Sequence, residues 1–285
     1  MNYIYIYSGD LPEYALTSIN SVLSVDNEAN VILCTETKYN FENVKCLTFS
    51  QVESELTKKV KEINYFENNK NSLWETSLLR IFYLLDVSNF LKLNNFIHFD
   101  VDVMIYKPFK DLVEYFKPSK FNITTVDEID LIFSYSFTNN IECFDNICNK
   151  IYEILENPNF YEDKYYRSKK LNEMMLLNIV YLENNHLFNI LPSIPSKSTD
   201  KNIIFDSITY GQYLSGSHNA KLSKYIVEES SYVGRYLLKK GPKVKFKDKP
   251  FLLIGETKYD LANLHIHSKK LEKFLPEKYE CLVRF

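Results

Sequence analysis

Two aspartates separated by a single residue are the most informative chemical feature of this sequence. Asp100 and Asp102 lie within the run 96–105, whose density of apolar residues is typical of a central strand. We expect both carboxylates to leave the sheltered end of that strand. Hard divalent cations such as Mn²⁺ and Mg²⁺ prefer oxygen ligands. The pair therefore predicts a site where both aspartates share the cation, or divide between the metal and a ligand hydroxyl.

Two histidines near the end of the sequence offer further ligands. His265 and His267 alternate with apolar residues, and this strand-like alternation places both imidazoles on one face. Lys269 follows two residues later, and a lysine beside a bound metal would suit a diphosphate. We expect at least one of the histidines to be a metal ligand. The alternative is an exposed strand end that carries two ordinary histidines.

A different chemistry uses the same two aspartates. In haloacid-dehalogenase-type phosphatases an apolar strand also ends in Asp-x-Asp, with the first aspartate as nucleophile and the second as acid and base. That chemistry needs Thr or Val two residues after the second aspartate, where this chain has Met104. It also needs a later acidic pair at a strand end, and the sequence offers no clear one. The phosphatase is therefore the less favoured alternative.

The elements that must position these residues alternate between strands and helices. Hydrophobic patterns predict strands at 3–7, 30–35, 44–49 and 96–105, and helices at about 13–24 and 73–86. Further along they predict strands near 129–137, 250–254 and 262–267, and helices near 141–156, 170–183 and 206–214. Such alternation favours an α/β fold with a mostly parallel sheet, in which ligands bind at the carboxyl ends of the strands. With no repeat or linker, we expect a single domain over 1–285.

Composition narrows the range of partners. The net charge is −3, so no overall positive field favours nucleic acid as a partner. We find no signal peptide and no apolar run long enough for a transmembrane segment, and the five cysteines lack metal-site spacing. These features predict a cytoplasmic protein, either free or peripheral at the inner membrane face. The basic stretch 239–249 is typical of a solvated hairpin.

Beyond these local patterns, the sequence resembles GT-A glycosyltransferases in their arginine-bearing helix and the Asp-x-Asp strand that follows it. The matching segments are WETSLLRIFYLL at 74–85 and FIHFDVDVMI at 96–105. Three further segments agree with the family in their order along the chain. YIYSGDLP at 5–12 is similar to the first strand and nucleotide-base loop, and LHIHSK at 264–269 is similar to the late histidine–lysine motif. FDSITYGQYL at 205–214 resembles a motif of some bacterial sugar transferases. The most similar members are those around glycogenin, the bacterial lipopolysaccharide galactosyltransferases and the DxD-containing sugar-binding enzymes.

The resemblance implies roles around a metal. Asp102 would be the main metal ligand, and Asp100 would contact the metal, the ribose or both. His265 or His267 would complete the metal shell, and Lys269 would meet the diphosphate. The sequence lacks the longer His-x-x-Gly-x-x-Lys-Pro-Trp ending of glycogenin-type enzymes, which leaves the choice of histidine open.

The resemblance also implies contacts with the donor. Arg80 would face it, whereas a helix arginine paired with a neighbouring carboxylate is the alternative. Tyr7, Ser8 and Asp10 would hold the base and ribose by stacking and hydrogen bonds. For the segment 8–10, a turn with no ligand is the alternative.

Two further carboxylates could face the acceptor. Glu173 and Asp206 are candidate catalytic residues, although a favourable charge at a helix start and a helix N-cap respectively explain them as well.

Together these observations favour one function over two alternatives. The resemblance implies a nucleotide-diphospho-sugar transferase of Rossmann-like GT-A fold, with the nucleotide-sugar half at about 1–110 and the acceptor-side half at about 111–285. It would use Mn²⁺ or Mg²⁺ to move a hexose from a nucleotide sugar, expected to be a UDP-sugar, to a glycan or lipid-linked saccharide in polysaccharide biosynthesis. Retention of anomeric configuration is favoured by resemblance alone. A non-catalytic sugar or nucleotide-sugar binding module is one alternative, and the phosphatase is the other.

Overall fold

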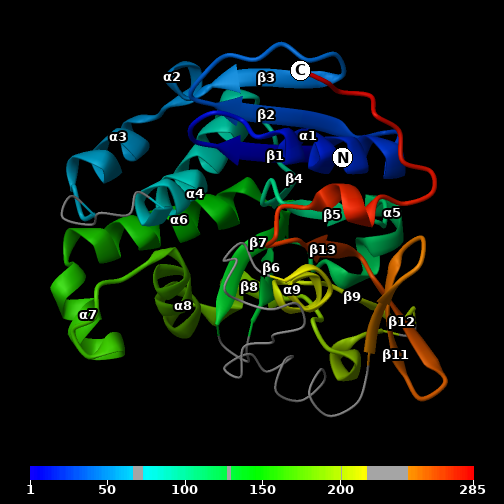
Figure 1. Ribbon diagram of the computed structural model, residues 1–285. Helices are drawn as coiled ribbons and strands as arrows, with labels where there is room; N and C mark the ends of the chain where they lie inside the picture. The colour runs from blue at the N-terminus through cyan, green and yellow to red at the C-terminus, as the bar shows by residue number, and fades with distance from the viewer. Residues whose placement is uncertain (67–72, 127–129, 200, 217–242) are drawn as a thin grey trace.

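A seven-stranded sheet forms the centre of the computed structural model, which describes residues 1–66, 73–126, 130–199, 201–216 and 243–285 (Figure 1). In spatial order its strands are β3 (Val44–Thr48), β2 (Asn30–Thr35), β1 (Asn2–Tyr7), β4 (Phe96–Phe99), β7 (Leu131–Thr138), β6 (Phe121–Thr125) and β8 (Phe188–Ile190). Neighbouring strands are parallel except where β7 pairs with β4 and β6. The expected α/β fold with a mostly parallel sheet is therefore confirmed.

Helices cover both faces of this sheet. The described helices are α1 (Glu13–Val25), α2 (Phe49–Val52), α3 (Glu55–Glu62), α4 (Leu73–Phe90), α5 (Phe109–Leu112), α6 (Ile141–Glu156), α7 (Pro158–Tyr166), α8 (Glu173–Glu183) and α9 (Thr209–Ser215). Along β1, Ile4 and Ile6 pack in the core with α4, α6 and α8, while Tyr3 and Tyr5 pack in the core with α1. This alternation follows from the two-residue period of a strand, and it explains why β1 is apolar throughout.

The predicted strand at 96–105 is broken into two. β4 belongs to the main sheet, whereas β5 (Val103–Ile105) pairs antiparallel with β13 (Asn263–His265) in a separate two-stranded sheet. Between them Val103 N–H donates to the Asp100 carbonyl at 3.0 Å, which closes a turn. The expectation of one continuous strand was therefore wrong, because β13, which is distant in sequence, supplies a second partner. The two aspartates lie on this turn.

A third sheet of four strands lies beside α9 and β13 (Figure 1). Its order is β10 (Lys243–Phe246), β11 (Pro250–Ile254), β12 (Thr257–Leu261) and β9 (Ile203–Ile204). β10 and β11 form a hairpin, as predicted for the basic stretch, although its residues 239–242 lie outside the described part of the chain. Residue 129, at the start of the strand predicted near 129–137, is outside it as well. Among the described helices, none is long and apolar enough to span a membrane.

The C-terminal segment packs against α1 through one buried asparagine. The side-chain oxygen of Asn20 accepts hydrogen bonds from the backbone N–H groups of Leu282 and Val283 at 3.0 and 2.7 Å, and its amide donates to the Val283 carbonyl at 2.9 Å. The Asn20 side chain therefore satisfies backbone hydrogen-bonding groups in a segment that belongs to no strand. The contact fixes the last residues of the sequence to the helix that follows β1.

Candidate metal centre

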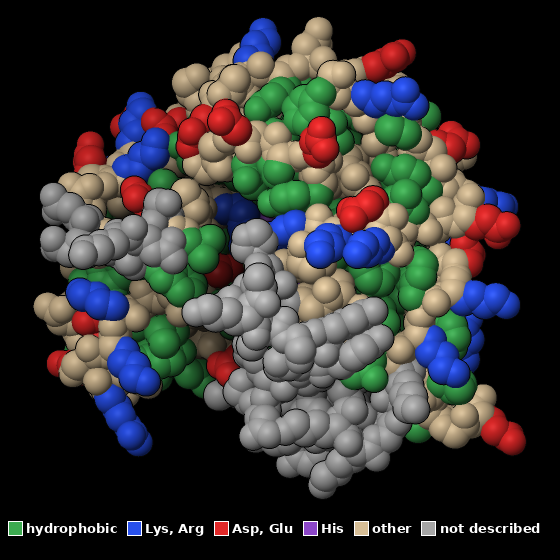
Figure 2. All heavy atoms as spheres, in the orientation of Figure 1, with side chains coloured by type: hydrophobic (Ala, Val, Ile, Leu, Met, Phe, Trp, Pro, Cys, Tyr) green, Lys and Arg blue, Asp and Glu red, His purple; other side chains and the backbone are tan. Residues whose placement is uncertain are grey.

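A cavity of about 900 Å³ opens at the carboxyl ends of β1, β2 and β4. Ser8 and Glu36, which follow β1 and β2, line it together with the β4–β5 turn and residues of α4. Figure 2 shows the hollow on this face of the molecule, with both acidic and basic side chains inside it. Its volume is in the range of small-molecule sites, and its place is where ligands bind in open α/β sheets.

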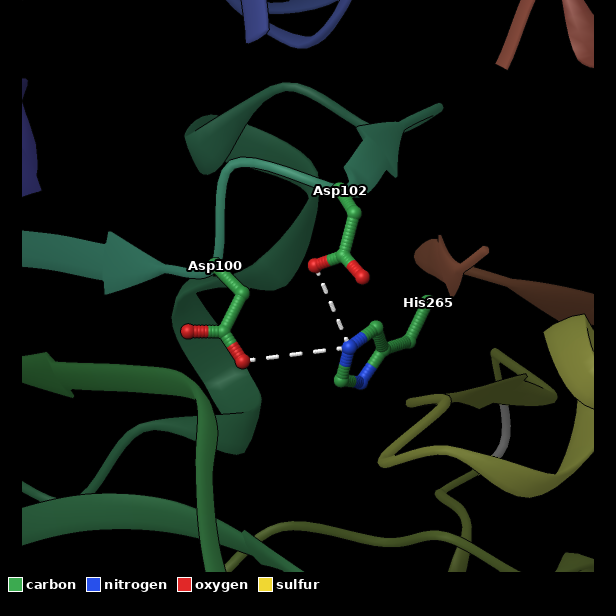
Figure 3. Close-up of side chains that lie close together, drawn as sticks. All are labelled: Asp100, Asp102 and His265. Atoms are coloured by element: carbon green, nitrogen blue, oxygen red, sulfur yellow. Dashed lines mark ion pairs between the residues drawn. The ribbon is translucent and has the colours of Figure 1, made fainter. Parts of the chain in front are cut away.

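Asp100, Asp102 and His265 converge inside this cavity (Figure 3). One potential ligand atom from each residue lies within 4.8 Å of the others. His265 Nε2 is 3.2 Å from Asp102 Oδ1 and 3.8 Å from Asp100 Oδ2. The two carboxylates come from the β4–β5 turn and the imidazole from β13, so the β5–β13 pairing brings them together.

The fixed orientation of His265 has an identifiable cause. Its Nδ1 is 2.7 Å from the carbonyl oxygen of Ser207, so that nitrogen donates and Nε2 faces the aspartates. A second hydrogen bond of this type is common for histidines that bind metals. Burial opposes a charged imidazole, but the carboxylate of Asp102 outweighs it and raises the pKa of His265.

Asp206 does not line the cavity, but it holds the backbone of the strand that carries His265. Its fully buried carboxylate accepts backbone N–H groups from Tyr210 at 2.9 Å, Gly211 at 2.7 Å and His265 at 2.9 Å. The first two bonds cap the N-terminus of α9, and the third holds the backbone of β13. Asp206 precedes Ile208, the N-cap residue of α9, by two positions, so it satisfies the start of the helix without being the N-cap itself. This geometry favours a structural role for Asp206 over a role on the acceptor side.

Arg80 forms ion pairs with two acidic residues that line the cavity. From α4 its guanidinium forms an ion pair with Asp100 and a longer one, of 3.5 Å, with Glu173 at the start of α8. Burial raises the pKa of Glu173, and Arg80 opposes that shift. All three side chains line the cavity. Arg80 is thus paired with carboxylates and also faces the space in which a ligand would lie, so both interpretations of this arginine remain compatible with its position.

Lys269 reaches the same centre from the turn after β13. Its ammonium forms an ion pair with Asp102 Oδ2, on the opposite side of that carboxylate from His265. Burial alone would disfavour the charged form of Asp102, but His265 and Lys269 outweigh it and hold the pKa of Asp102 well below its usual range. Asp102 is therefore held as an anion by Lys269 and His265, which lie against its two carboxylate oxygens.

His267 lies beside the cluster without joining it. Its ring centre is 4.4 Å from that of His265, and the residue lines the cavity. Burial lowers the pKa of His267 to about 3, which keeps the imidazole neutral. Its Nε2 is buried and has no hydrogen-bond partner among the residues that the structure describes. His265 is therefore the histidine in place against both aspartates, and His267 offers a spare nitrogen next to it.

The residues expected to hold a nucleotide fall into two groups. Tyr7 and Ser8 line the cavity at the end of β1, and the Ser8 hydroxyl donates a hydrogen bond to Glu36. Asp10 is exposed and is absent from the lining. For Asp10 the structure therefore favours the turn interpretation.

Several lining residues were not singled out from the sequence. They include Tyr14, Glu36, Glu53, Trp74 and Tyr83. Tyr14 lies at α1, next to the Lys269 ammonium, which is 5.7 Å from the centre of its ring. Trp74 and Tyr83 lie within the segment 74–85 that carries the resemblance, whereas no local motif marks Glu36. Glu36 directly follows β2, and its only available signal was that residues after parallel strands share one edge of the sheet.

The donor set fits a hard divalent cation. The two carboxylates supply the oxygen ligands that Mn²⁺ and Mg²⁺ prefer, and the imidazole of His265 adds one nitrogen ligand. These residues are therefore suited to hold such a metal.

Comparisons with known proteins concern the fold. The sequence matches no protein-family model and no curated protein. Similar solved structures include mouse xyloside xylosyltransferase 1 in its apo form, which is 12% identical over 67% of this chain and 86% of its own, with a TM-score of 0.45.

Two further transferases give similar values. The galactosyltransferase LgtC, in complex with donor and acceptor sugar analogues, is 8% identical over 93% of this chain and 87% of its own, with a TM-score of 0.46. The apo form of the glycosyltransferase GlyE in Streptococcus pneumoniae TIGR4 is 10% identical over 74% of this chain and 48% of its own, with a TM-score of 0.42. All three structures are therefore similar to this chain at 12% identity or less and with TM-scores below 0.5.

Proposed function

We propose that this protein is a metal-dependent glycosyltransferase that moves a hexose from a nucleotide sugar, most simply a UDP-sugar, to a glycan or lipid-linked saccharide. One observation carries the proposal. Asp100, Asp102 and His265 converge in a large cavity at the carboxyl ends of parallel strands, with Arg80 and Lys269 on either side. This combination places cation ligands and permanent cations where a diphosphate can be held.

The residue types match the charge that the reaction develops. Cleavage of the bond between a sugar and a nucleoside diphosphate leaves additional negative charge on the diphosphate. A divalent cation held by Asp100, Asp102 and His265 would supply Lewis-acid stabilisation of that leaving group. Lys269 and Arg80 add fixed positive charge within the same cavity. Because Asp102 is buried, its interactions act in a medium of low dielectric, where they are stronger.

The ends of β1 and β2 are the proposed nucleoside side of the cavity. Tyr7 offers a ring for stacking, and Ser8 with Glu36 offers a hydroxyl and a carboxylate for the base or ribose. The rest of the lining, which includes Trp74 and Glu173, is the proposed place for the sugars.

Retention of configuration is the proposed stereochemical outcome. An inverting enzyme needs a carboxylate that is free to take a proton from the acceptor hydroxyl. Glu173 is the candidate on that side, and Arg80 engages it in an ion pair. That ion pair turns one oxygen of Glu173 towards Arg80 and not towards an acceptor, which supports a mechanism in which the leaving diphosphate takes the acceptor proton.

The phosphatase alternative is disfavoured by the contacts of Asp100. That residue would have to be the nucleophile, yet Arg80 pairs with one of its oxygens and His265 faces the other. A non-catalytic nucleotide-sugar module remains the second alternative, and turnover distinguishes it.

The test is nucleotide release from a panel of UDP-, GDP-, ADP- and CMP-sugars with Mn²⁺, Mg²⁺ or EDTA. We expect release from one donor that EDTA abolishes and that Asp102→Asn reduces by at least about a hundredfold. Asp111→Asn, on α5 and outside the cavity lining, is the matched control and should keep full activity.

Ligand binding is followed separately through Trp74, the single tryptophan of the sequence, which lines the cavity. Metal-dependent quenching by a nucleotide without any turnover, with a range of saccharide acceptors present, would support the binding module. Release of inorganic phosphate would support the phosphatase. Neither binding nor release from any donor would overturn the proposal.

A further inference from the structure

The ion pair between Lys269 and Asp102 occupies a carboxylate that the proposed metal also needs. Asp102 presents Oδ1 to His265 and Oδ2 to the Lys269 ammonium, so both of its oxygens have a positively polarised neighbour. The Asp102 side chain is 4% exposed and that of Lys269 is 32% exposed. The carboxylate is thus fixed inside the protein, whereas the lysine enters from the open side.

The backbone around this pair is held firmly. The N–H of Ile266 donates to the Asp102 carbonyl at 2.9 Å, and the N–H of Lys269 donates to the Ile266 carbonyl at 2.9 Å. These bonds tie the turn after β13 to the turn that carries the aspartates. The base of the lysine therefore cannot move away from Asp102, and only its flexible four-carbon stem can redirect the charge.

A bound divalent cation and the lysine ammonium cannot both keep their places. Oxygen ligands lie about 2.0–2.6 Å from such cations, so a cation held by Asp102 would lie very close to the ammonium on the same carboxylate. Two positive charges at that range repel strongly in a buried site. The buried anion needs one counter-charge, and either partner can supply it.

We propose that Lys269 is an internal counter-ion: it neutralises Asp102 in the metal-free protein, is displaced when the metal binds, and then becomes available to a diphosphate. This inference rests on the metal site proposed above. It makes metal and diphosphate binding mutually dependent, because each draws on the same lysine, and such coupling is reciprocal. The protein would thus disfavour a metal without a nucleotide and favour the two together.

Titration calorimetry with Mn²⁺ alone, without any nucleotide, tests the first half of the inference. The variants are Lys269→Met and, as the matched control, Lys270→Met, since Lys270 is the exposed neighbour in sequence. Methionine keeps a long unbranched stem, and at Lys269, where φ is +61°, it replaces one L residue with another. We expect Lys269→Met to bind Mn²⁺ about tenfold more tightly than wild type, and Lys270→Met to remain within about twofold.

Repeating the titrations with saturating UDP tests the second half. UDP should tighten Mn²⁺ binding by a larger factor in wild type than in Lys269→Met, because only the wild-type chain releases a lysine to the diphosphate. Equal or weaker Mn²⁺ binding by Lys269→Met in the absence of UDP, with an unchanged melting temperature, would refute the inference.

Asp102→Asn separates this inference from the proposed function. If wild type binds Mn²⁺ and Asp102→Asn does not, the metal site stands, and the behaviour of Lys269→Met decides the counter-ion role alone. If no variant binds Mn²⁺ with or without UDP, both proposals fail together.

Discussion

Substitution of Gly211 by alanine tests how the site is held together. Gly211 lies in α9 directly against β13, and a Cβ added there would be 2.0 Å from the carbonyl oxygen of His265 and 2.6 Å from its carbonyl carbon. These are backbone atoms, which cannot rotate away. Ordinary contact begins near 3.4 Å, so α9 and β13 would have to separate by about 1.4 Å, which is 3.4 less 2.0. Such a shift strains the hydrogen bonds from Gly211 and His265 to Asp206.

The expected loss follows from opposing contributions. Helix propensity alone favours alanine by about 1 kcal/mol. Overpacking costs about 1–3 kcal/mol, and stretching one or two buried hydrogen bonds to a carboxylate costs about 1.5–3 kcal/mol each. The net change is a loss of roughly 2–8 kcal/mol in the free energy of unfolding, measured by urea denaturation. Since His265 is displaced, Mn²⁺ affinity should fall as well.

Gly255→Ala is the matched control. Gly255 lies on the turn between β11 and β12 at φ +57°, and an added Cβ there meets nothing within 4 Å. Its substitution should cost about 1–2 kcal/mol from the left-handed backbone and leave Mn²⁺ affinity unchanged. If Gly211→Ala is as stable as wild type and binds Mn²⁺ equally well, the argument that Gly211 and Asp206 position His265 is wrong.

Three further predictions concern other parts of the chain. Burial raises the pKa of Asp86 in the folded protein, so the folded state keeps a proton that the unfolded state loses as pH rises above the ordinary pKa of an aspartate. Wild type therefore loses stability as pH rises, whereas Asp86→Asn does not. The unfolding free energy of Asp86→Asn relative to wild type should increase with pH between 4 and 7, by at most about 1.4 kcal/mol per pH unit. A flat difference would refute this. Asn20→Ala should cost about 2–4 kcal/mol by urea denaturation, since it removes three hydrogen bonds to the C-terminal segment, and a loss below 1 kcal/mol would mean that this contact is not needed. Asp10→Asn should change nucleotide affinity, followed by Trp74 fluorescence, by no more than about twofold, and a tenfold loss would restore Asp10 as a donor contact.

The first part of the fold was readable from sequence because its signals are local. The strands at 3–7 and 30–35 and the helix at 13–24 agree with β1, β2 and α1 to within one residue at each end. Each has a clear period and polar residues at its ends, and these depend on neighbours along the chain. The run 96–105 lacks such a signal at its break, since its residues are apolar on both sides of the turn. Only its pairing with β13 divides it.

The candidate site was predictable in its residue types and less so in its geometry. Asp100, Asp102, His265 and Lys269 could be grouped from spacing and resemblance, and the structure brings them into contact. The position of Asp206 could not be foreseen, because its carboxylate is satisfied by the backbone of His265, 59 residues later. A carboxylate bonded to backbone N–H groups and one that faces a ligand look the same in sequence.

The turn that carries the aspartates is anchored to two different sheets. The N–H of Asp100 donates to the Ser134 carbonyl of the main sheet at 3.2 Å, and the Asp102 carbonyl accepts from Ile266, which follows the strand of the small sheet. The separation of the two carboxylates therefore depends on how these sheets are packed against each other. Substitutions far from the cavity that shift one sheet relative to the other by a fraction of an ångström would change the distance between the carboxylates, and with it the cation that fits between them. Mutations where the two sheets pack against each other therefore offer an evolutionary route to a new metal preference in which no ligand is replaced.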